Sequence, residues 1–323
     1  IKKYLYADTC KAARKVTEQL LRTLSRDYGE FFPEIAWRDA FSLPQDLRKI
    51  SVEMLKEHDL GESTRWVICC GSPCTGFSAA GKGLGLKDSQ SSLLIDLLKL
   101  ISSMQSQARK PPGYLIENAP VSTIARLKSQ DGTNELSAKL RAMMGQEVLL
   151  DAAQCGSRAH RLRSFWTNLV TAESLQLVIS KVQRDDQIRA NQVLQDGWST
   201  QAVANDDKPP QFVCNRKGEE MRAMPTFTKV RGSRAFRDEG PGMLVRKIGN
   251  DLTSAYREPD PAEKLLMMGF SQDLLSVPGV SIEQAHGLIG NAIDLTALST
   301  MLSLAEAVAC VRIPDGKELG ERV

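Results

Sequence analysis

Residues 66–78 read Trp-Val-Ile-Cys-Cys-Gly-Ser-Pro-Cys-Thr-Gly-Phe-Ser, an apolar run that passes directly into a loop of small residues. The apolar run predicts a buried strand, and the glycine and proline after it predict where that strand ends. A strand that ends in this way holds the thiol of Cys74 at the carboxyl edge of a sheet. The stretch therefore predicts a strand of the central sheet and the position of a chemically useful thiol.

A carboxylate follows the next predicted strand in the same manner. Gly113–Ile116 is a short apolar segment, and Glu117 and Asn118 come directly after it. A thiol and a carboxyl group at the ends of neighbouring strands can attack an electron-poor ring and protonate it. We therefore expect Cys74 and Glu117 to act on one substrate.

Composition disfavours several classes of protein. The chain has 323 residues, 42% of them apolar and 25% charged, which is typical of one large domain or a domain with a smaller lobe. No apolar run approaches the ~20 residues of a membrane-spanning helix. The seven cysteines include no Cys-x-x-Cys pair, which favours a reducing compartment inside the cell and disfavours a structural zinc. With three histidines, a histidine-rich metal site or a Ser-His-Asp triad is not expected.

The positive charge of the chain is small but unevenly distributed. The net charge is +3, yet ten lysines and arginines stand against four acidic residues between Lys208 and Lys247. Such a stretch suits the phosphates of a nucleic acid, and it also suits an ordinary solvated loop. Charge alone leaves these two interpretations open.

Short apolar runs alternate with helical patterns over the first half of the chain. Strands are predicted at 4–7, 35–37, 66–70, 113–116, 147–151 and 164–168. Helices are predicted after Asp8, over 44–59, from a cap at Ser89 to Met104, within 121–144, at 261–268 and from 291 to about 308. This alternation predicts an α/β fold with a mostly parallel sheet and helices on both faces. It stops between about 169 and 225, which predicts a small loop-rich lobe.

Several separated motifs resemble those of the cytosine-C5 DNA methyltransferase family, in the family's order. The stretches that carry the resemblance are Gly71–Ser78 (catalytic loop), Glu117-Asn118 (Glu-Asn motif), Arg161-Leu-Arg163 (Arg-x-Arg strand), Pro225–Thr228, Glu263–Phe270 and Ile289–Ile293. The surroundings of the Arg-x-Arg strand resemble the eukaryotic de novo branch, whereas the final Gly-Asn-Ala resembles bacterial enzymes.

The resemblance implies a Rossmann-like methyltransferase fold that uses S-adenosylmethionine and acts on double-stranded DNA. It makes Cys74 the nucleophile that adds to C6 of a cytosine, while Glu117 donates a hydrogen bond or proton to N3, so that C5 can accept the methyl group. It gives Arg161 the task of bracing Glu117, and Arg163 that of holding O2 of the base. Because C6 is buried in duplex DNA, the cytosine must be flipped out of the helix.

Five further residues fall where the family binds its cofactor. Asp8 is placed like the acidic residue that binds the ribose hydroxyls, and Asp39 like the residue that contacts the adenine amine. Pro73, Leu93 and Asn291 fall where the family lines the rest of the pocket. Structural roles stay open beside these, since Asp8 can simply cap the helix that follows it and Leu93 packs in a core in any case.

The family's first motif, a strand with a Phe-x-Gly-x-Gly turn that cradles the methionine end of the cofactor, is absent from this sequence. We expect residues 1–168 to form the catalytic core without that strand and Gly-rich loop. Residues 169–225 are expected to be a small target-recognition region, and 226–323 the return to the core.

The sequence therefore predicts a DNA (cytosine-5)-methyltransferase catalytic domain, inside the cell and in the nucleus, which could associate with itself or with another methyltransferase. The missing motif keeps an alternative open, a catalytically inactive regulatory relative that binds DNA or an active methyltransferase. Methylation of cytosine in tRNA is a third interpretation.

Overall fold

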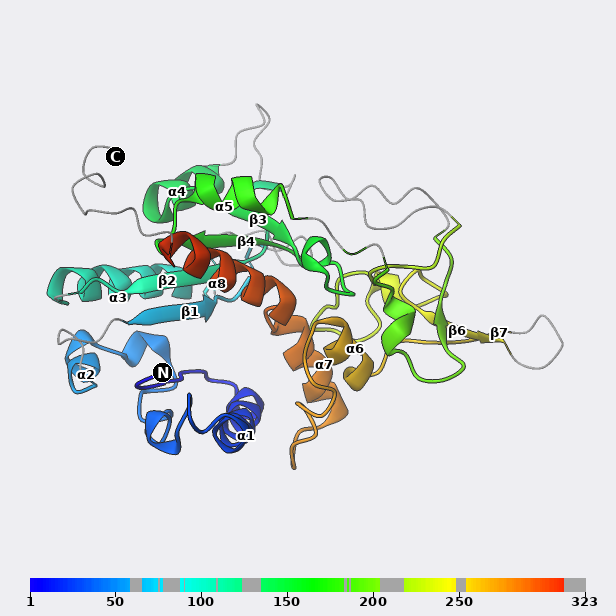
Figure 1. The fold of residues 1–323 in the computed structure, drawn as a ribbon, viewed down its shortest axis with the longest axis horizontal. Helices are drawn as coiled ribbons and strands as arrows, with labels where there is room; N and C mark the ends of the chain where they lie inside the picture. The colour runs from blue at the N-terminus through cyan, green and yellow to red at the C-terminus, as the bar shows by residue number, and fades with distance from the viewer. Residues whose placement is uncertain are drawn as a thin grey trace.

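The computed structural model consists of a central sheet with helices on both faces, an N-terminal helical part beside it and a smaller sheet at the other end (Figure 1). It describes residues 1–58, 66–74, 76–77, 88–89, 91–108, 110–123, 135–182, 185, 187–203, 218–247 and 254–310.

The central sheet has the strand order β1-β2-β4-β3. Strand β1 (Val67–Gly71) runs parallel to β2 (Gly113–Asn118). Strand β4 (Leu162–Thr167) is antiparallel to both β2 and β3 (Val148–Asp151). The predicted α/β class is therefore confirmed, and the sheet formed by the described strands is mixed.

The antiparallel pairs arise because β3 and β4 are joined without a crossover helix. The chain leaves β3 through the 3-10 turn Ala152–Cys155 (η6) and turns at Gly156, whose φ of 99° lies in the left-handed region that favours glycine. It then returns as β4 beside β3. The expectation of a mostly parallel sheet assumed a crossover at each connection, and this connection has none.

Helices cover both faces of this sheet, as expected. Helix α3 (Leu93–Gln107), together with α4 (Glu135–Met144), packs on the face that contains Ile116 of β2. Helices α5 (Ala172–Ile179) and α8 (Leu295–Cys310) pack on the opposite face. Successive side chains of a strand point to opposite faces, so neighbouring residues of β2 belong to different cores.

The N-terminal part is helical rather than stranded. It contains α1 (Lys11–Asp27), α2 (Val52–Lys56) and the 3-10 turns Glu34–Ala36 (η1) and Leu47–Lys49 (η2). The strands predicted at 4–7 and 35–37 are wrong. The amides of Tyr4 and Tyr6 donate to the carbonyls of Ala36 and Ala40 (2.7 Å each). These acceptors are four positions apart, so the partner segment is coiled and no ladder forms.

A second sheet, with the order β5-β6-β7, lies at the other end of the molecule (Figure 1). Its strands are Ser199–Thr200 (β5), Leu244–Lys247 (β6) and Ser254–Arg257 (β7), and the 3-10 turns Ala190–Val193 (η7) and Arg234–Phe236 (η8) flank it. These strands come from both sides of residue 225. The division into 1–168, 169–225 and 226–323 stays a prediction.

Helices α6 (Pro261–Met267) and α7 (Ile282–Asn291) follow β7 in the chain and lie between the two sheets (Figure 1). They lead into α8, which packs on the central sheet. The stretch Ile282–Leu304 is long and apolar enough, by length and composition alone, to cross a membrane. It does not form one continuous helix, because Ala292 is extended (ψ 148°) and Asp294 caps the start of α8. The two resulting helices bury side chains in different cores.

Candidate functional site

The ends of β1 and β2 form the floor of the candidate site. Gly71 lies directly opposite Glu117 in the parallel register, and the amide of Ser72 donates to the Glu117 carbonyl (3.3 Å). The Asn118 side chain then donates to the Ser72 hydroxyl (2.5 Å). The chain that leads to Cys74 is thus tied to the Glu-Asn segment, as the sequence predicted for two neighbouring strand ends.

The loop that carries Cys74 is held from behind by residues before α3. Cys74 is half-buried and packs at the edge of the core of α3 and α4. The amide of Gly76 donates to the hydroxyl of Ser91 (2.9 Å), which is fully buried, and the Ser91 amide donates to Asp88 (3.0 Å). Phe77, also fully buried, donates its amide to the Cys74 carbonyl (2.9 Å). These contacts fix the backbone on the C-terminal side of the thiol.

Glu117 forms an ion pair with the second arginine of the Arg-x-Arg strand. The Nε atom of Arg163 lies 2.8 Å from Oε1 of Glu117, and both side chains are largely buried. The resemblance assigned the contact with Glu117 to Arg161, whereas in the structure Arg163 makes it. The register explains it, because Glu117 lies opposite Phe165 and its diagonal neighbour on the same face is Arg163.

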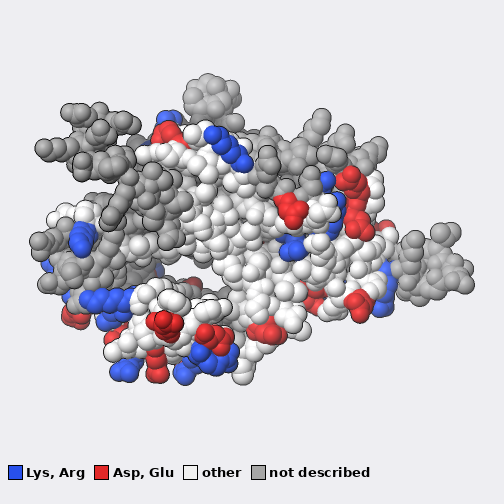
Figure 2. All heavy atoms as spheres, in the orientation of Figure 1, with Lys and Arg blue, Asp and Glu red and all other residues white. Residues whose placement is uncertain are grey.

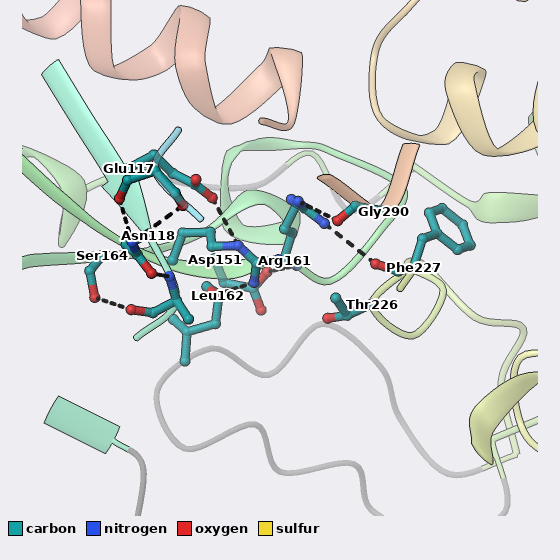
Figure 3. A network of polar contacts seen from close by, with 12 residues as sticks. Glu117, Asn118, Asp151, Arg161, Leu162, Ser164, Thr226, Phe227 and Gly290 are labelled. Carbon is teal, nitrogen blue, oxygen red and sulfur yellow. Dashed lines mark hydrogen bonds and ion pairs between the residues drawn. The ribbon is translucent and has the colours of Figure 1, made fainter. Parts of the chain in front are cut away.

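Arg161 instead joins three separate segments of the chain. Its guanidinium donates to the carbonyls of Gly290 (3.1 Å) and Phe227 (3.4 Å), and its own amide donates to Asp151 (2.8 Å) (Figure 3). Burial, followed by repulsion from Arg163, lowers the pKa of Arg161 to about 10, so it stays charged at neutral pH. Arg161 therefore ties β4 to the ends of the 225–228 segment and of α7.

Both predicted catalytic side chains act electrostatically on Arg161. The charges of Glu117, Asp294 and Cys74 each oppose the fall in its pKa. Asp294 is itself buried and accepts hydrogen bonds from Ser157 (2.7 Å) and from the Ala297 amide (3.1 Å). Burial raises the pKa of Asp294 to about 6. The thiol and the carboxylate thus share one electrostatic neighbourhood.

The predicted ribose ligand, Asp8, lies two residues before the N-cap of α1, and its charge acts on the Cys70 thiol of β1. Burial raises the pKa of the Cys70 thiol to about 12, and the charges of Glu117, Cys69 and Asp8 add to this effect. One Asp8 oxygen accepts from the Cys10 amide (2.7 Å) and the other from the Tyr6 hydroxyl (3.2 Å). Asp8 does not cap α1, because Cys10 is the N-cap residue and no side chain caps this helix. Each carboxylate oxygen of Asp8 can accept a second hydrogen bond, so Asp8 can still hold a hydroxyl group.

The other predicted cofactor residues come from the N-terminal part, from the ends of β1 and α7 and from the start of α3. Asp39 is exposed and pairs with Lys3 (3.5 Å), beside the backbone contact between Tyr6 and Ala40. Asn291 is exposed at the end of α7, just before Ile293. A Cβ built on Gly71 would lie 3.5 Å from Ile293, so the link between α7 and α8 lies against the end of β1.

Pro73 and Leu93 are both half-buried, the first two positions after β1 and the second at the start of α3. Acidic, amide and apolar groups of this kind fit the adenosine end of S-adenosylmethionine. The described residues contain no Gly-rich cradle for its methionine end.

Sequence reasoning missed three contributors to this site. Ser91 lies in the run Asp88–Ser92, which was predicted to contain a helix cap at Ser89, whereas Ser91 acts on the loop of Cys74. Asp294 stands just before an apolar helix, a capping signal that was not used. Asp151 ends β3 and bonds both the Arg161 amide and the imidazole of His160 (2.9 Å). Asp151 was predicted only as the end of a strand.

Some sequence predictions lie outside the described residues. They are Thr75 and Ser78 of the catalytic loop and the first quarter of the basic stretch, Lys208–Lys217.

Comparison with known proteins places this site in context. Residues 43–229 match the family model of the C-5 cytosine-specific DNA methylases. The type II methyltransferase M.NlaX of Neisseria lactamica is 24% identical over 278 residues, which is 81% of this chain and 80% of that protein. M.HaeII of Haemophilus aegyptius is 32% identical over 89 residues, so the matched part spans only 23% of its length. Among solved structures, the Entamoeba histolytica methyltransferase EhMeth has a TM-score of 0.57 with 12% identity, over 94% of this chain and 90% of that one.

Proposed function

Because the chain belongs to the C-5 cytosine-specific DNA methylase family, whose members use S-adenosylmethionine, we propose that it methylates C5 of cytosine in duplex DNA. The observation that carries the proposal is the tie between the two strand ends that bear Cys74 and Glu117: Gly71 lies opposite Glu117 in the parallel register, and the Asn118 side chain donates to the Ser72 hydroxyl (2.5 Å). S-adenosylmethionine would supply an electrophilic methyl group.

We propose that the sulfur of Cys74 adds to C6 of a flipped cytosine. When the S–C6 bond forms, the electrons of the C5=C6 bond shift to C5. C5 of a free cytosine is a poor nucleophile, and this shift lets it attack an electrophile. After the methyl group is bound, loss of the proton from C5 lets the S–C6 bond break and restores the ring. The hydrogen bond from the Gly76 amide to the Ser91 hydroxyl supports this role. It fixes the loop that carries Cys74, and the attacking sulfur must be positioned within a fraction of an ångström.

Glu117 is proposed to bind N3 of the same base. Its ion pair with Arg163 fixes the carboxylate rotamer, and Gly71 itself adds no side chain next to Oε2. The protonated carboxyl group of Glu117 would donate a hydrogen bond from Oε2 to N3, which stabilises the electron-rich ring that forms during attack, while Oε1 keeps its contact with Arg163. Arg163 would then act through Glu117. Arg161 would hold the wall of the pocket through Gly290 and Phe227.

The adenosine end of the cofactor is proposed to lie between Asp8, Asp39, Pro73, Leu93 and Asn291. We also propose that a strand and a Gly-rich turn from outside these 323 residues complete the site beside β1. Among the described residues the outer edge of β1 has no strand partner, and Val67 is 52% exposed there. Figure 2 shows the surface hollowed between the N-terminal part and the rest of the molecule.

Transfer of tritium from methyl-labelled S-adenosylmethionine to duplex DNA tests the proposal. We expect transfer by the wild-type chain, no transfer by Cys74→Ser, and normal transfer by Cys69→Ser, which changes an exposed cysteine on β1. Competition between tRNA and duplex DNA as substrates distinguishes methylation of tRNA from methylation of DNA. If the wild type binds DNA but neither binds the cofactor nor transfers the methyl group, also after a Gly-rich segment is added upstream, the regulatory alternative replaces this proposal. The nuclear location and the oligomeric state stay predictions.

A further inference from the structure

The turn Lys229–Arg231 displays an exposed valine between two exposed cations. Val230 is 71% exposed, Lys229 is exposed, and the Arg231 side chain is 64% exposed. Single exposed apolar residues are common on protein surfaces. This one differs because its backbone is held firmly from several sides.

The turn is tied down on both sides of Val230. The hydroxyl of Thr228 donates to the Val230 carbonyl (2.9 Å), and the amide of Gly232 donates to Glu258 (3.1 Å). Gly232 has a φ of 64°, in the left-handed region, which sharpens the turn. Glu258 is fixed in turn by the buried ammonium of Lys264 (2.5 Å). The valine therefore stays exposed on a rigid support.

The turn also begins at the wall of the candidate site. Figure 3 shows Thr226 and Phe227 facing Arg161 and Gly290. The Thr226 hydroxyl donates to the His160 carbonyl (2.7 Å), and a Cβ on Gly290 would overlap the backbone of Thr228 and Lys229. Val230 follows Phe227 by three residues, so their Cα atoms are at most about 11 Å apart.

We propose that Val230 is a wedge that enters the duplex where the target cytosine leaves it, while Lys229 and Arg231 contact the phosphates on either side. This rests on the proposed function. An apolar side chain that fills the gap replaces part of the stacking lost on extrusion, which costs a few kcal/mol. The neighbouring cations neutralise phosphates without reading the sequence.

The test uses the sequence context that the wild-type chain methylates, identified by bisulfite sequencing of a treated plasmid. In a duplex with 2-aminopurine at the target position, the wild type should raise the fluorescence as the base unstacks. We expect Val230→Ala to lower this signal and to weaken binding to fully paired DNA about tenfold. Leu177→Ala, which truncates a 58% exposed leucine on α5, is the matched control and should change neither.

A second substrate separates a wedge from a simple surface contact. An abasic site opposite the target lowers the cost of extrusion, so Val230→Ala should bind this duplex within about twofold of the wild type. Lys229→Gln and Arg231→Gln should each reduce the slope of log Kd against log salt by about one.

Equal fluorescence and equal affinity of Val230→Ala and wild type on paired DNA overturn the wedge and leave the proposed function intact. If the wild-type chain methylates no DNA, both the wedge and the proposed function are rejected.

Discussion

The Nε atom of Arg163 lies 2.8 Å from Oε1 of Glu117, and the exposed fractions of the two side chains are 16% and 7%. A buried ion pair contributes little net stability by itself, but the removal of one partner leaves an uncompensated charge in a poorly solvated place. The pair therefore fixes the orientation of Glu117 more than it stabilises the fold.

A double-mutant cycle on Glu117 and Arg163 should report strong coupling. Each single change, Glu117→Gln or Arg163→Gln, is expected to lower the free energy of unfolding by about 3 kcal/mol, and the double change by less than the sum. The coupling should be on the order of 1–3 kcal/mol in urea unfolding. The same cycle with Arg161→Gln is the control and should give a smaller value. A larger coupling to Arg161 would restore the original assignment of the brace.

The support behind the catalytic loop can be tested at Ser91. Ser91→Ala leaves the buried amide of Gly76 without an acceptor, which costs about 1–3 kcal/mol. We expect a lower rate of methyl transfer at saturating DNA and cofactor, because the loop of Cys74 loses its anchor. Ser92→Ala is the matched control, since the Ser92 hydroxyl bonds only the exposed carbonyl of Ser89 (2.9 Å), and it should cost less than about 0.5 kcal/mol. Equal effects of the two variants would contradict this role of Ser91.

Gly71 is expected to tolerate only a very small side chain. A Cβ there would lie 3.4 Å from Oε2 of Glu117 and 3.5 Å from two atoms of Ile293. Gly71→Ala should keep most activity, whereas Gly71→Val must displace Glu117 or Ile293 at a cost of about 1–3 kcal/mol. The expected readout is a fall of at least about tenfold in kcat/KM for Gly71→Val, equivalent to about 1.4 kcal/mol. Gly287→Val is the control, because nothing lies within 4 Å of its Cβ. Full activity of Gly71→Val would show that this space is not used.

The elements that carry the motifs could be predicted from the sequence, because local patterns determine them. The strand ending at Gly71, the strand before Glu117 and the helix after Ser92 all form close to where apolar runs and punctuating residues predict them. The sequence predictions that were wrong concern the pairing of strands. Segments 4–7 and 35–37 have strand-like composition, but a strand also needs a partner of matching geometry, which the sequence does not reveal.

The roles of the two arginines could not be predicted for the same reason. Arg161 directly precedes β4 and Arg163 lies on it, two positions apart, so from the sequence both are expected on one face and equally able to reach Glu117. The antiparallel register, with Glu117 opposite Phe165, decides in favour of Arg163. Asp294 and Ser157 lie far apart in the sequence and meet only because α8 packs beside η6. Contacts of this kind follow from the tertiary fold.

Asp294 should make stability depend on pH in a direction opposite to an ordinary ion-paired carboxylate. Its folded pKa of about 6 lies above the ordinary aspartate value of 3.8, so the folded state binds this proton more tightly than the unfolded state. The contribution is fully present below pH 3.8 and is lost as the pH rises through about 6.

Asp294→Asn imitates the protonated form and can still accept from the Ala297 amide. We expect the variant to exceed the wild type in free energy of unfolding by about 2–3 kcal/mol more at pH 8 than at pH 4.5, from a shift of about two pKa units. Asp39→Asn, on an exposed carboxylate, should differ from the wild type by less than about 0.5 kcal/mol at both pH values. An advantage of Asp294→Asn that is the same at both pH values would show that Asp294 is ionised in neither or in both.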